Sequence, residues 1–433
     1  MKRTAMILLF SVLTSPLPAQ EIWPLERCIS YALAHNLDIR EKQVEVVVRQ
    51  TELTQHRLSW LPTLAVGLEQ NWNWGRSVDM QELVIIRNAL TRATGASVGA
   101  SLPLFDGFSR FHQQVAAKKA VDVATLEADD LRTSLETDVT RAYLELMLAK
   151  QIHAYSRESH ATIVQQRDRT AQLVEAGSQP KSALNEMEAQ VAAEKAALVS
   201  AECRVRSATL SLTRLMNLPG DTPFSAGEQF GPDTVAIRVT LLSDAQTEAW
   251  LQCDPRLRSA EARIAQLRAE EQAAKGRFLP TLSASASYGT FYSSTNETPF
   301  RTQLDENRNP SVALRLNIPI FDGWQAATQL KKSRLALEMA RLTAEKLQTQ
   351  VLEEIRSASI EAENCLQRYL SSEETLQAMQ SLLEITEAKY NLGAATALDY
   401  IVARNNRLKA VSDYLQAKWQ YLFQLRLLER YRL

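Results

Sequence analysis

Two kinds of hydrophobic spacing divide this chain of 433 residues. In four segments apolar and polar residues alternate, which is the period of a β-strand with one apolar face. These segments are residues 63–75, 94–105, 281–292 and 311–321. Residues 108–176 and 324–391 instead carry apolar residues at helical spacing and contain neither Gly nor Pro. At 1.5 Å per residue each predicts a helix of about 100 Å, too long for a globular core, so we expect a coiled-coil or α-barrel stalk.

The same order of segments occurs twice. The run Leu61-Pro62-Thr63-Leu64 opens the first strand and returns as Leu279-Pro280-Thr281-Leu282 at the third. Each long helix is broken by a glycine, Gly177 or Gly393, and is followed by a return helix at 181–218 or 397–432. We therefore predict a first repeat over 20–218, an irregular linker rich in Gly and Pro over 219–244, and a second repeat over 245–433.

A Pro-x-Phe-Asp-Gly motif joins the second strand of each repeat to the long helix. Its junction residues are Pro103, Asp106, Gly107, Pro319, Asp322 and Gly323. An Asp just before a helix caps the first turn by accepting its free N–H groups. Neither Asp has a His or a second carboxylate near it in the sequence, so we interpret both as caps and not as catalytic acids.

Composition and charge exclude several functions. The 49 basic and 50 acidic residues give a net charge of −1, which argues against nucleic acid as a partner. We find no motif for a catalytic residue, a cofactor or a metal, so we expect no enzyme. The four cysteines (Cys28, Cys203, Cys253 and Cys365) are too scattered for a disulfide framework.

The amino-terminal segment predicts export. Residues 1–19 combine a basic start, a short apolar run and a small-residue end, which is typical of a secretory signal peptide. Glu26 and Arg27 stand where a lipoprotein site has small residues, so we expect no lipid on Cys28.

The four strands have the length and alternation of outer-membrane strands. In that interpretation their polar positions line a water-filled lumen, and aromatic residues near the loop ends form a girdle at the lipid interface. The polar positions are Glu69, Asn71, Asn73, Arg315 and Asn317, and the aromatic ones are Trp72, Trp74, Tyr288 and Tyr292. Four strands cannot close a barrel, so a membrane protein of this kind must pool strands in an oligomer. The alternative is a soluble periplasmic coiled-coil scaffold with no channel, in which the strands form a sheet packed on helices.

The order and duplication of these motifs resemble the TolC-like outer-membrane factors. The resemblance implies a homotrimer in the outer membrane of a Gram-negative bacterium, with four strands per protomer in a 12-stranded β-barrel and a long periplasmic α-helical barrel. It implies a passive exit duct for tripartite efflux or type I secretion, without a cofactor. Its partners would be outer-membrane lipid, a periplasmic adaptor (membrane fusion protein) and an inner-membrane pump of the resistance-nodulation-division or ABC type.

The resemblance also implies a gate at the periplasmic tip. Asp399, six residues after Gly393, matches one acidic position of the family's constriction, whereas Val402 stands where a second acid occurs. A single acidic ring from Asp399 is our hypothesis, and a capping Asp at a helix start is the alternative. The turns at Gly177 and Gly393 would contact the adaptor, and Ala183, the first-repeat counterpart of Asp399, carries no charge.

Overall fold

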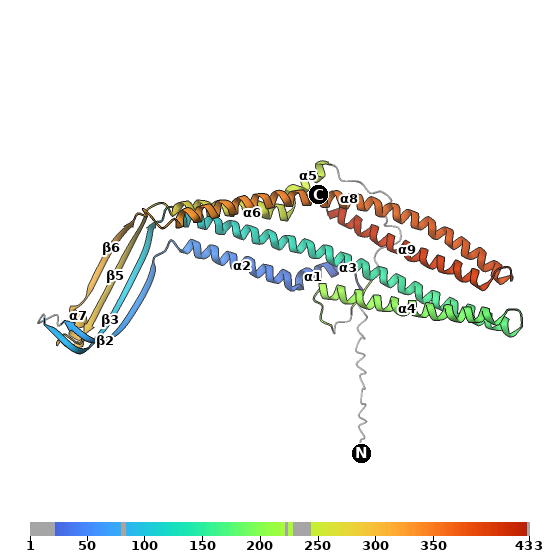
Figure 1. The fold of residues 1–433 in the computed structure, drawn as a ribbon, viewed down its shortest axis with the longest axis horizontal. Helices are drawn as coiled ribbons and strands as arrows, with labels where there is room; N and C mark the ends of the chain where they lie inside the picture. Colours follow the sequence, from blue (N-terminus) through green and yellow to red (C-terminus); the bar gives the residue numbers. More distant parts are fainter. Residues whose placement is uncertain (1–21, 79–83, 221–223, 228–243, 431–433) are drawn as a thin grey trace, which may run out of the picture. The chain divides into compact units, whose positions relative to one another are not determined.

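The computed structural model describes residues 22–78, 84–220, 224–227 and 244–430 (Figure 1). The predicted signal peptide and most of the predicted linker lie outside these residues. The chain divides into two compact units. One comprises Met1–Glu41, Asp130–Leu251 and Val351–Leu433, and the other comprises Lys42–Asp129 and Gln252–Gln350. Each is described by itself below.

The second unit contains one antiparallel sheet of four strands in the order β2-β3-β5-β6 (Figure 1). Its strands are β2 (Thr63–Val78), β3 (Ile85–Phe105), β5 (Thr281–Ser293) and β6 (Asn309–Asn317). Except beyond the register shifts at Gly75/Ser77 and Pro103/Phe105, residues of odd number pair with residues of odd number, as in Gly67↔Ser97, Ser97↔Gly289 and Ser287↔Ser311. Because side chains alternate between faces, the odd positions share one face and the even positions share the other.

The strand bounds differ from the sequence prediction. Residues 76–93, which lie between the first two predicted strands, largely belong to β2 and β3, since Trp72 pairs with Arg92 and Trp74 with Leu90. Backbone pairing in an antiparallel hairpin does not require an apolar face, so the ladder continues where the alternation ends. The fourth strand ends at Asn317 and not at residue 321, two residues before Pro319, which has no N–H to donate.

Helix α7 (Phe300–Glu306) was not expected from the pattern. It packs on the even face of the sheet: the Thr290 hydroxyl donates to the Leu304 carbonyl at 2.6 Å, and the Tyr292 and Phe300 ring centroids are 4.9 Å apart. The buried Gln303 amide donates to the carbonyls of Ser293, Asn296 and Thr298 and accepts from the Ser293 N–H. These bonds join residues that no helical or strand spacing in the sequence relates, so the hydrophobic pattern could not predict them.

The remaining helices of this unit precede or follow the strands. Helix α2 (Leu37–Leu58) leads into β2 and α6 (Pro255–Gly276) into β5. The long helices α3 (Ser109–Glu175) and α8 (Gln325–Asn391) begin after β3 and β6 and run on into the other unit.

The first unit is built from two helical hairpins, α3 with α4 (Lys181–Leu215) and α8 with α9 (Ala397–Arg430) (Figure 1). Helix α1 (Leu25–His35), α5 (Asp244–Cys253) and the short parallel pair β1 (Ile22–Trp23) and β4 (Ser225–Ala226) complete it. A buried cluster that includes Trp23, Cys28, Tyr143, Met216 and Trp419 joins β1, α1, α3, β4 and α9 with the end of α4. No helix in the described part of the chain is both long and apolar enough to cross a membrane.

Candidate functional site: sheet faces, junctions and helix turns

The polar side chains predicted to line a lumen lie on one face of the sheet. Glu69, Asn71 and Asn73 are odd positions of β2, and the pairing register puts Arg315 and Asn317 of β6 on the same face. The opposite face carries aliphatic residues, and many of them are exposed. They include Leu64, Val66, Leu68, Val312, Leu314 and Leu316. The sheet of a single chain thus presents one polar face and one uncovered apolar face.

The four predicted interface aromatics lie on the apolar face but not at one level. Trp72 and Trp74 are near the hairpin end of β2, and Tyr292 packs against α7. Tyr288 pairs with Val98, eight residues along β3 from Leu90, the partner of Trp74. At about 3.4 Å per residue this separates Tyr288 from Trp74 by about 27 Å along the strand. Tyr288 therefore does not share a girdle row with the tryptophans.

The first strand-to-helix junction is closed by the chain itself. The Asp106 carboxylate accepts from the backbone N–H and the Nε of Arg110, at 3.1 and 2.9 Å. The Arg110 guanidinium also donates to the carbonyls of Ser59 and Pro103 and lies 4.5 Å from the Trp60 ring centroid. Asp106 is thus a cap held by an arginine that ties the end of α2 to the start of α3.

Gly107 adds a backbone contact to this junction. Its φ is +66°, and a Cβ there would lie 2.2 Å from the Gly276 carbonyl oxygen at the end of α6. A Cβ at Gly276 would in turn lie 2.5 Å from the Gly107 oxygen. Only glycine at both positions permits this approach.

The second junction has the same backbone and fewer partners. The Asp322 carboxylate accepts from the Ala326 N–H at 2.7 Å, and Gly323 has a φ of +67°. Ala326 stands in the place of Arg110, and among the described residues nothing lies within 4 Å of a Cβ built on Gly323. Ile320, the second residue of this motif, is 96% exposed.

The two predicted helix turns have the same geometry. Gly177 and Gly393 both have a φ of +73°, and each donates its N–H to a carbonyl three residues back. The next residue, Ser178 or Ala394, donates to a carbonyl five residues back at 2.8 Å. This is a Schellman motif, in which a left-handed glycine satisfies the last carbonyls of the helix.

Asp399 caps the helix that follows the second turn. Its carboxylate accepts from the Thr396 hydroxyl at 2.7 Å and from the Thr396 N–H at 3.0 Å, and the Asp399 N–H donates back to that hydroxyl. These bonds form a capping box and lower the pKa of the Asp399 carboxyl, which is exposed. The capping role weighed from the sequence is therefore present, and Val402 is exposed one turn further on.

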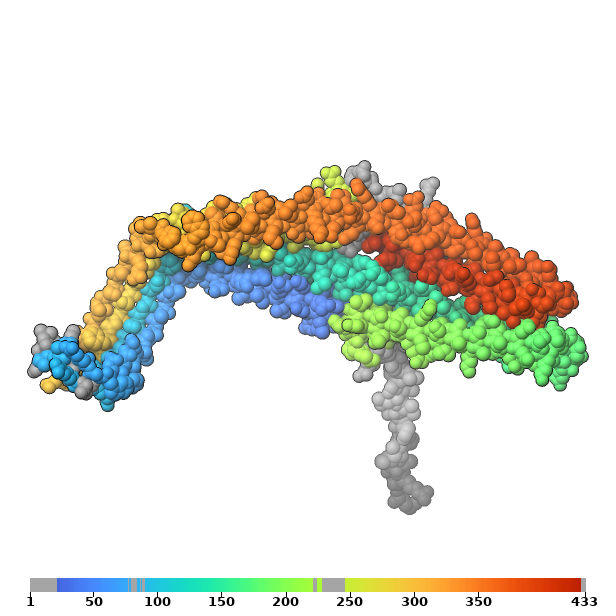
Figure 2. All heavy atoms as spheres, in the orientation of Figure 1, coloured from blue at the N-terminus to red at the C-terminus, as the bar shows by residue number. Residues whose placement is uncertain are grey.

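A buried ion pair near the turns was not predicted. Arg404 of α9 donates its Nε to Glu194 of α4 at 2.9 Å, with the two side chains 8% and 4% exposed. The Ser159 hydroxyl of α3 accepts from Arg404 and donates to Glu194, both at 2.7 Å. Figure 2 shows the surfaces of α4 (green) and α9 (red) meeting in this part of the molecule. Glu194 lies in an alanine-rich run, and no local pattern distinguishes it from exposed acids nearby.

Two tyrosines extend this link toward the turns. The Tyr390 hydroxyl of α8 is 3.1 Å from the Thr170 hydroxyl of α3, and its ring stacks on that of Tyr400 with centroids 5.4 Å apart. Burial raises the pKa of the Tyr400 phenol, so this group stays neutral at physiological pH. Helices of both hairpins are thus joined by buried polar bonds.

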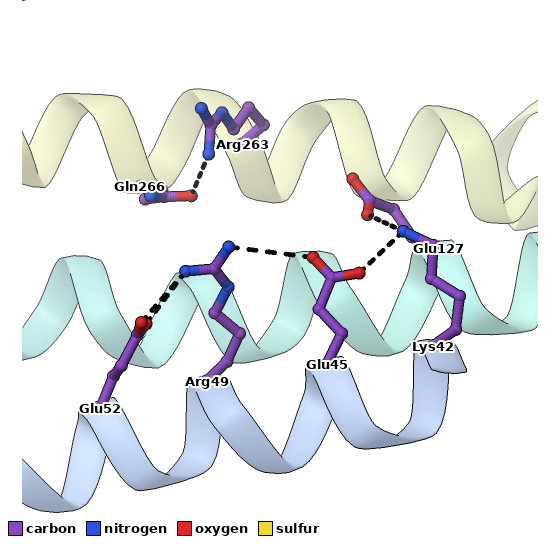
Figure 3. A network of polar contacts seen from close by, with 7 residues as sticks. All are labelled: Lys42, Glu45, Arg49, Glu52, Glu127, Arg263 and Gln266. Carbon is purple, nitrogen blue, oxygen red and sulfur yellow. Dashed lines mark hydrogen bonds and ion pairs between the residues drawn. The ribbon is translucent and has the colours of Figure 1, made fainter. Parts of the chain in front are cut away.

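Helix α2 turns a charged row toward α3 (Figure 3). Lys42 contacts Glu45 at 2.8 Å and Glu127 of α3 at 3.4 Å, and Arg49 contacts Glu52 at 3.0 Å. These side chains are 35–46% exposed, so each pair is worth at most about 1 kcal/mol. Of these pairs, Lys42–Glu127 joins α2 to α3 and the other two lie within α2, whose Val44 and Val47 are exposed.

The chain matches the family described as outer membrane efflux protein over residues 28–218 and 247–431. It belongs to this family. Membership locates the protein in the outer membrane and gives it the fold of a channel, not of an enzyme.

Two curated relatives of this efflux family show how far its sequences diverge. The chain is 23% identical to outer membrane protein TolC of Escherichia coli K12 over 399 residues, which covers 89% of this chain and 77% of the relative. It is 24% identical to outer membrane efflux protein BepC of Brucella suis, over 76% of this chain and 69% of the relative.

Solved channels share the fold. The Campylobacter jejuni CmeC outer membrane channel superposes with a TM-score of 0.81 at 16% identity, covering 93% of this chain and 84% of that one. The outer membrane protein VceC of Vibrio cholerae gives 0.78 at 17% identity, covering 94% and 95%. At such identities the similarity establishes the fold alone.

The cysteines of this family member are free thiols in the described structure. Cys28 lies in α1 within the buried cluster, where burial raises the pKa of its thiol to about 12. Cys365 is also buried, and Cys203 and Cys253 are exposed. The described residues contain no group of three or more His, Cys, Asp or Glu side chains arranged to hold a metal ion.

Proposed function

We propose that the protein is the outer-membrane exit duct of an efflux or type I secretion system, a passive trimeric channel-tunnel. The observation that carries this proposal is the sheet with one polar and one exposed apolar face. Soluble proteins rarely leave so large an apolar surface in water, and lipid is the solvent it fits. The odd face, with Glu69, Asn71, Asn73, Arg315 and Asn317, lines the lumen.

Barrel closure requires more than one chain. Among the described residues the outer strands β2 and β6 each pair on one side only, and unpaired backbone groups cost several kcal/mol each in lipid. Four strands are too few for a barrel, whereas three copies supply twelve. The number three comes from the resemblance to the TolC-like factors, and the number of strands per protomer comes from the sheet.

The long hairpins continue the lumen as a tunnel that opens at its tip. The turns at Gly177 and Gly393 contact a periplasmic adaptor, which acts with an inner-membrane pump of the resistance-nodulation-division or ABC type. Asp399 adds a single ring of negative charge beside the turn, in addition to its capping role. Its exposure and its lowered pKa support this proposal, because both keep the carboxylate ionised.

The gate is tested with Asp399→Asn, which retains a capping acceptor and removes the charge. We expect the conductance of the closed duct to change and its cation preference to fall in planar bilayers. Thr396→Val, which removes the hydroxyl of the capping box and keeps the carboxylate, serves as the control. If Asp399→Asn leaves conductance and ion preference unchanged, the carboxylate is a cap and nothing more.

The function itself is tested by fractionation and conductance of the wild-type protein. We expect trimers that require detergent for extraction, lose their association on heating, and conduct ions across a bilayer. A soluble periplasmic scaffold would instead appear as monomers in detergent-free buffer, and that result would overturn the proposal.

A further inference from the structure

In the described part of the chain the outer strands β2 and β6 each pair on one side only, and β6 of one copy could pair with β2 of another. Neighbouring strands in the order β2-β3-β5-β6 are all antiparallel, so β6 runs opposite to β2. A second copy placed beside β6 with its own β2 edge would therefore extend the same antiparallel pattern. Repeating this head-to-tail contact closes a ring.

The strand hairpins β2–β3 and β5–β6 have the same pairing register. Thr63 pairs with Ser101, and Thr281 pairs with Asn317. Each position of β5 thus corresponds to the one 218 residues earlier in β2 (281 and 63), and each of β6 to the one 216 earlier in β3 (317 and 101). The next pairs, Leu64↔Ala100 and Leu282↔Leu316, keep these two offsets.

The contact between β3 and β5 is an internal template for joining one hairpin to the next. Gly99 pairs with Ser287 in this ladder. The counterpart of Gly99 in β6 is Arg315, and the counterpart of Ser287 in β2 is Glu69. The same pairing between β6 and β2 would therefore place Arg315 opposite Glu69. We propose that β6 pairs with β2 of a second copy in this register, so that Arg315 forms an ion pair with Glu69 of the neighbouring copy. This inference rests on the oligomeric duct proposed above.

The charges favour this register over its alternatives. Glu69 and Arg315 are the two charged residues among odd positions 63–73, 91–101, 281–293 and 309–317, and they lie on opposite edges of one chain's sheet. A shift of two residues would set Glu69 opposite Ala313 or Asn317. A shift of one residue would turn the apolar face into the lumen. In the single chain Asn71 donates to the Glu69 carboxylate at 2.9 Å, which keeps this carboxylate at the β2 edge.

The helices next to the sheet have exposed residues where this arrangement would bring a neighbouring copy into contact. In the template the end of α6 lies against the start of α3, at Gly276 and Gly107, so the end of α2 of the neighbouring copy would lie against the start of α8. Val123 of α3 is 8% exposed, whereas its counterpart Met339 of α8 is 69% exposed. On α6 the residues Ala269, Ala273 and Gly276 are buried, and the corresponding α2 residues Thr51, Gln55 and Leu58 are exposed.

One substitution makes the two contacts unequal. Leu58 corresponds to Gly276, whose hydrogen permits the close approach to Gly107. The larger Leu58 cannot approach Gly323 of the neighbouring copy as closely. At this level α2 of one copy and α8 of the next would therefore lie further apart than α6 and α3 do within one chain.

Cysteine crosslinking tests the register directly. The variant Glu69→Cys with Arg315→Cys is made in a chain whose exposed Cys203 and Cys253 are replaced by Ser. Directly opposed residues have Cα atoms about 4.5–5.5 Å apart, within disulfide range, and diagonal ones about 7–8 Å. We expect oxidation to give a covalent trimer that survives boiling and separates on reduction. Asn71→Cys with Arg315→Cys is the matched control and should give only traces.

Charge exchange tests the ion pair. Arg315→Glu alone should lower the temperature at which trimers dissociate, since it sets two carboxylates opposite each other, and Glu69→Arg with Arg315→Glu should restore it. Efficient crosslinking of the control pair would overturn the register, and so would intact trimers in which neither pair crosslinks. Neither result would contradict the proposed duct. Failure of the exchange to restore stability overturns the ion pair, and a wild-type protein that forms no trimer overturns the proposed function.

Discussion

The two strand-to-helix junctions have the same backbone and different surroundings. Both place a left-handed glycine after an aspartate cap, followed by an aromatic residue of positive φ, Phe108 or Trp324. The first is bound by Arg110 and by the glycine contact with α6, and the second is open. The sequence motif determines the turn, whereas packing depends on what the neighbouring helix supplies. In the duct we propose, that helix belongs to the same chain at one junction and to the next copy at the other.

Replacing each junction glycine by Ala should give the largest difference in stability loss between the two junctions. Gly107→Ala combines left-handed strain with a Cβ 2.2 Å from a backbone oxygen, and we expect a loss of about 3–5 kcal/mol. Gly323→Ala has only the strain within the chain, about 1–2 kcal/mol. The midpoint temperature of trimer dissociation would report both. Gly99→Ala, at an ordinary φ with open space around it, is the control, and equal losses at the two junctions would refute the contrast.

Removal of Arg110 should loosen only the first junction. In Arg110→Ala the Asp106 carboxylate keeps the backbone N–H of residue 110 but loses the guanidinium, and the Ser59 and Pro103 carbonyls lose the same donor group, which should cost about 1.5–3 kcal/mol in urea unfolding. Arg206→Ala is the control, because its pair with Glu202 is exposed and should contribute less than about 1 kcal/mol. Similar losses from both arginines would mean that Arg110 does not hold the junction.

The charged cap at the start of α9 should give the smallest effect. The Asp399 pKa is lowered from its usual value of 3.8, so its stabilising contribution is present above that pH and is lost as the pH falls through the lower folded value. Unfolding of wild type and Asp399→Asn should therefore differ slightly near neutral pH and converge in acid. A difference that grows on acidification would contradict the capping box.

The sequence predicted the parts of the fold that depend on short spacing. The period of two assigned the faces of the strands, and Gly177 and Gly393 marked the two turns. It could not predict α7 or the Glu194–Arg404 pair, because Gln303 bonds a loop around itself and the ion pair joins residues 210 positions apart. Nor did the two Phe-Asp-Gly motifs reveal that one junction contacts Arg110 and Gly276, while at the other no described residue lies within 4 Å of a Cβ built on Gly323. That contrast arises from residues outside the motif.

Accessibility of adjacent residues on β3 tests the duct most directly. Ser97 lies on the polar face and Val98 on the apolar face of this central strand, and both are exposed. Each would be replaced by Cys in the chain lacking the exposed native thiols, and a charged methanethiosulfonate reagent would be added to single channels in a planar bilayer. Our proposal predicts a stepwise fall in current for Ser97→Cys and no change for Val98→Cys. An equal response of the two variants, or a wild-type protein that conducts no ions, would contradict it.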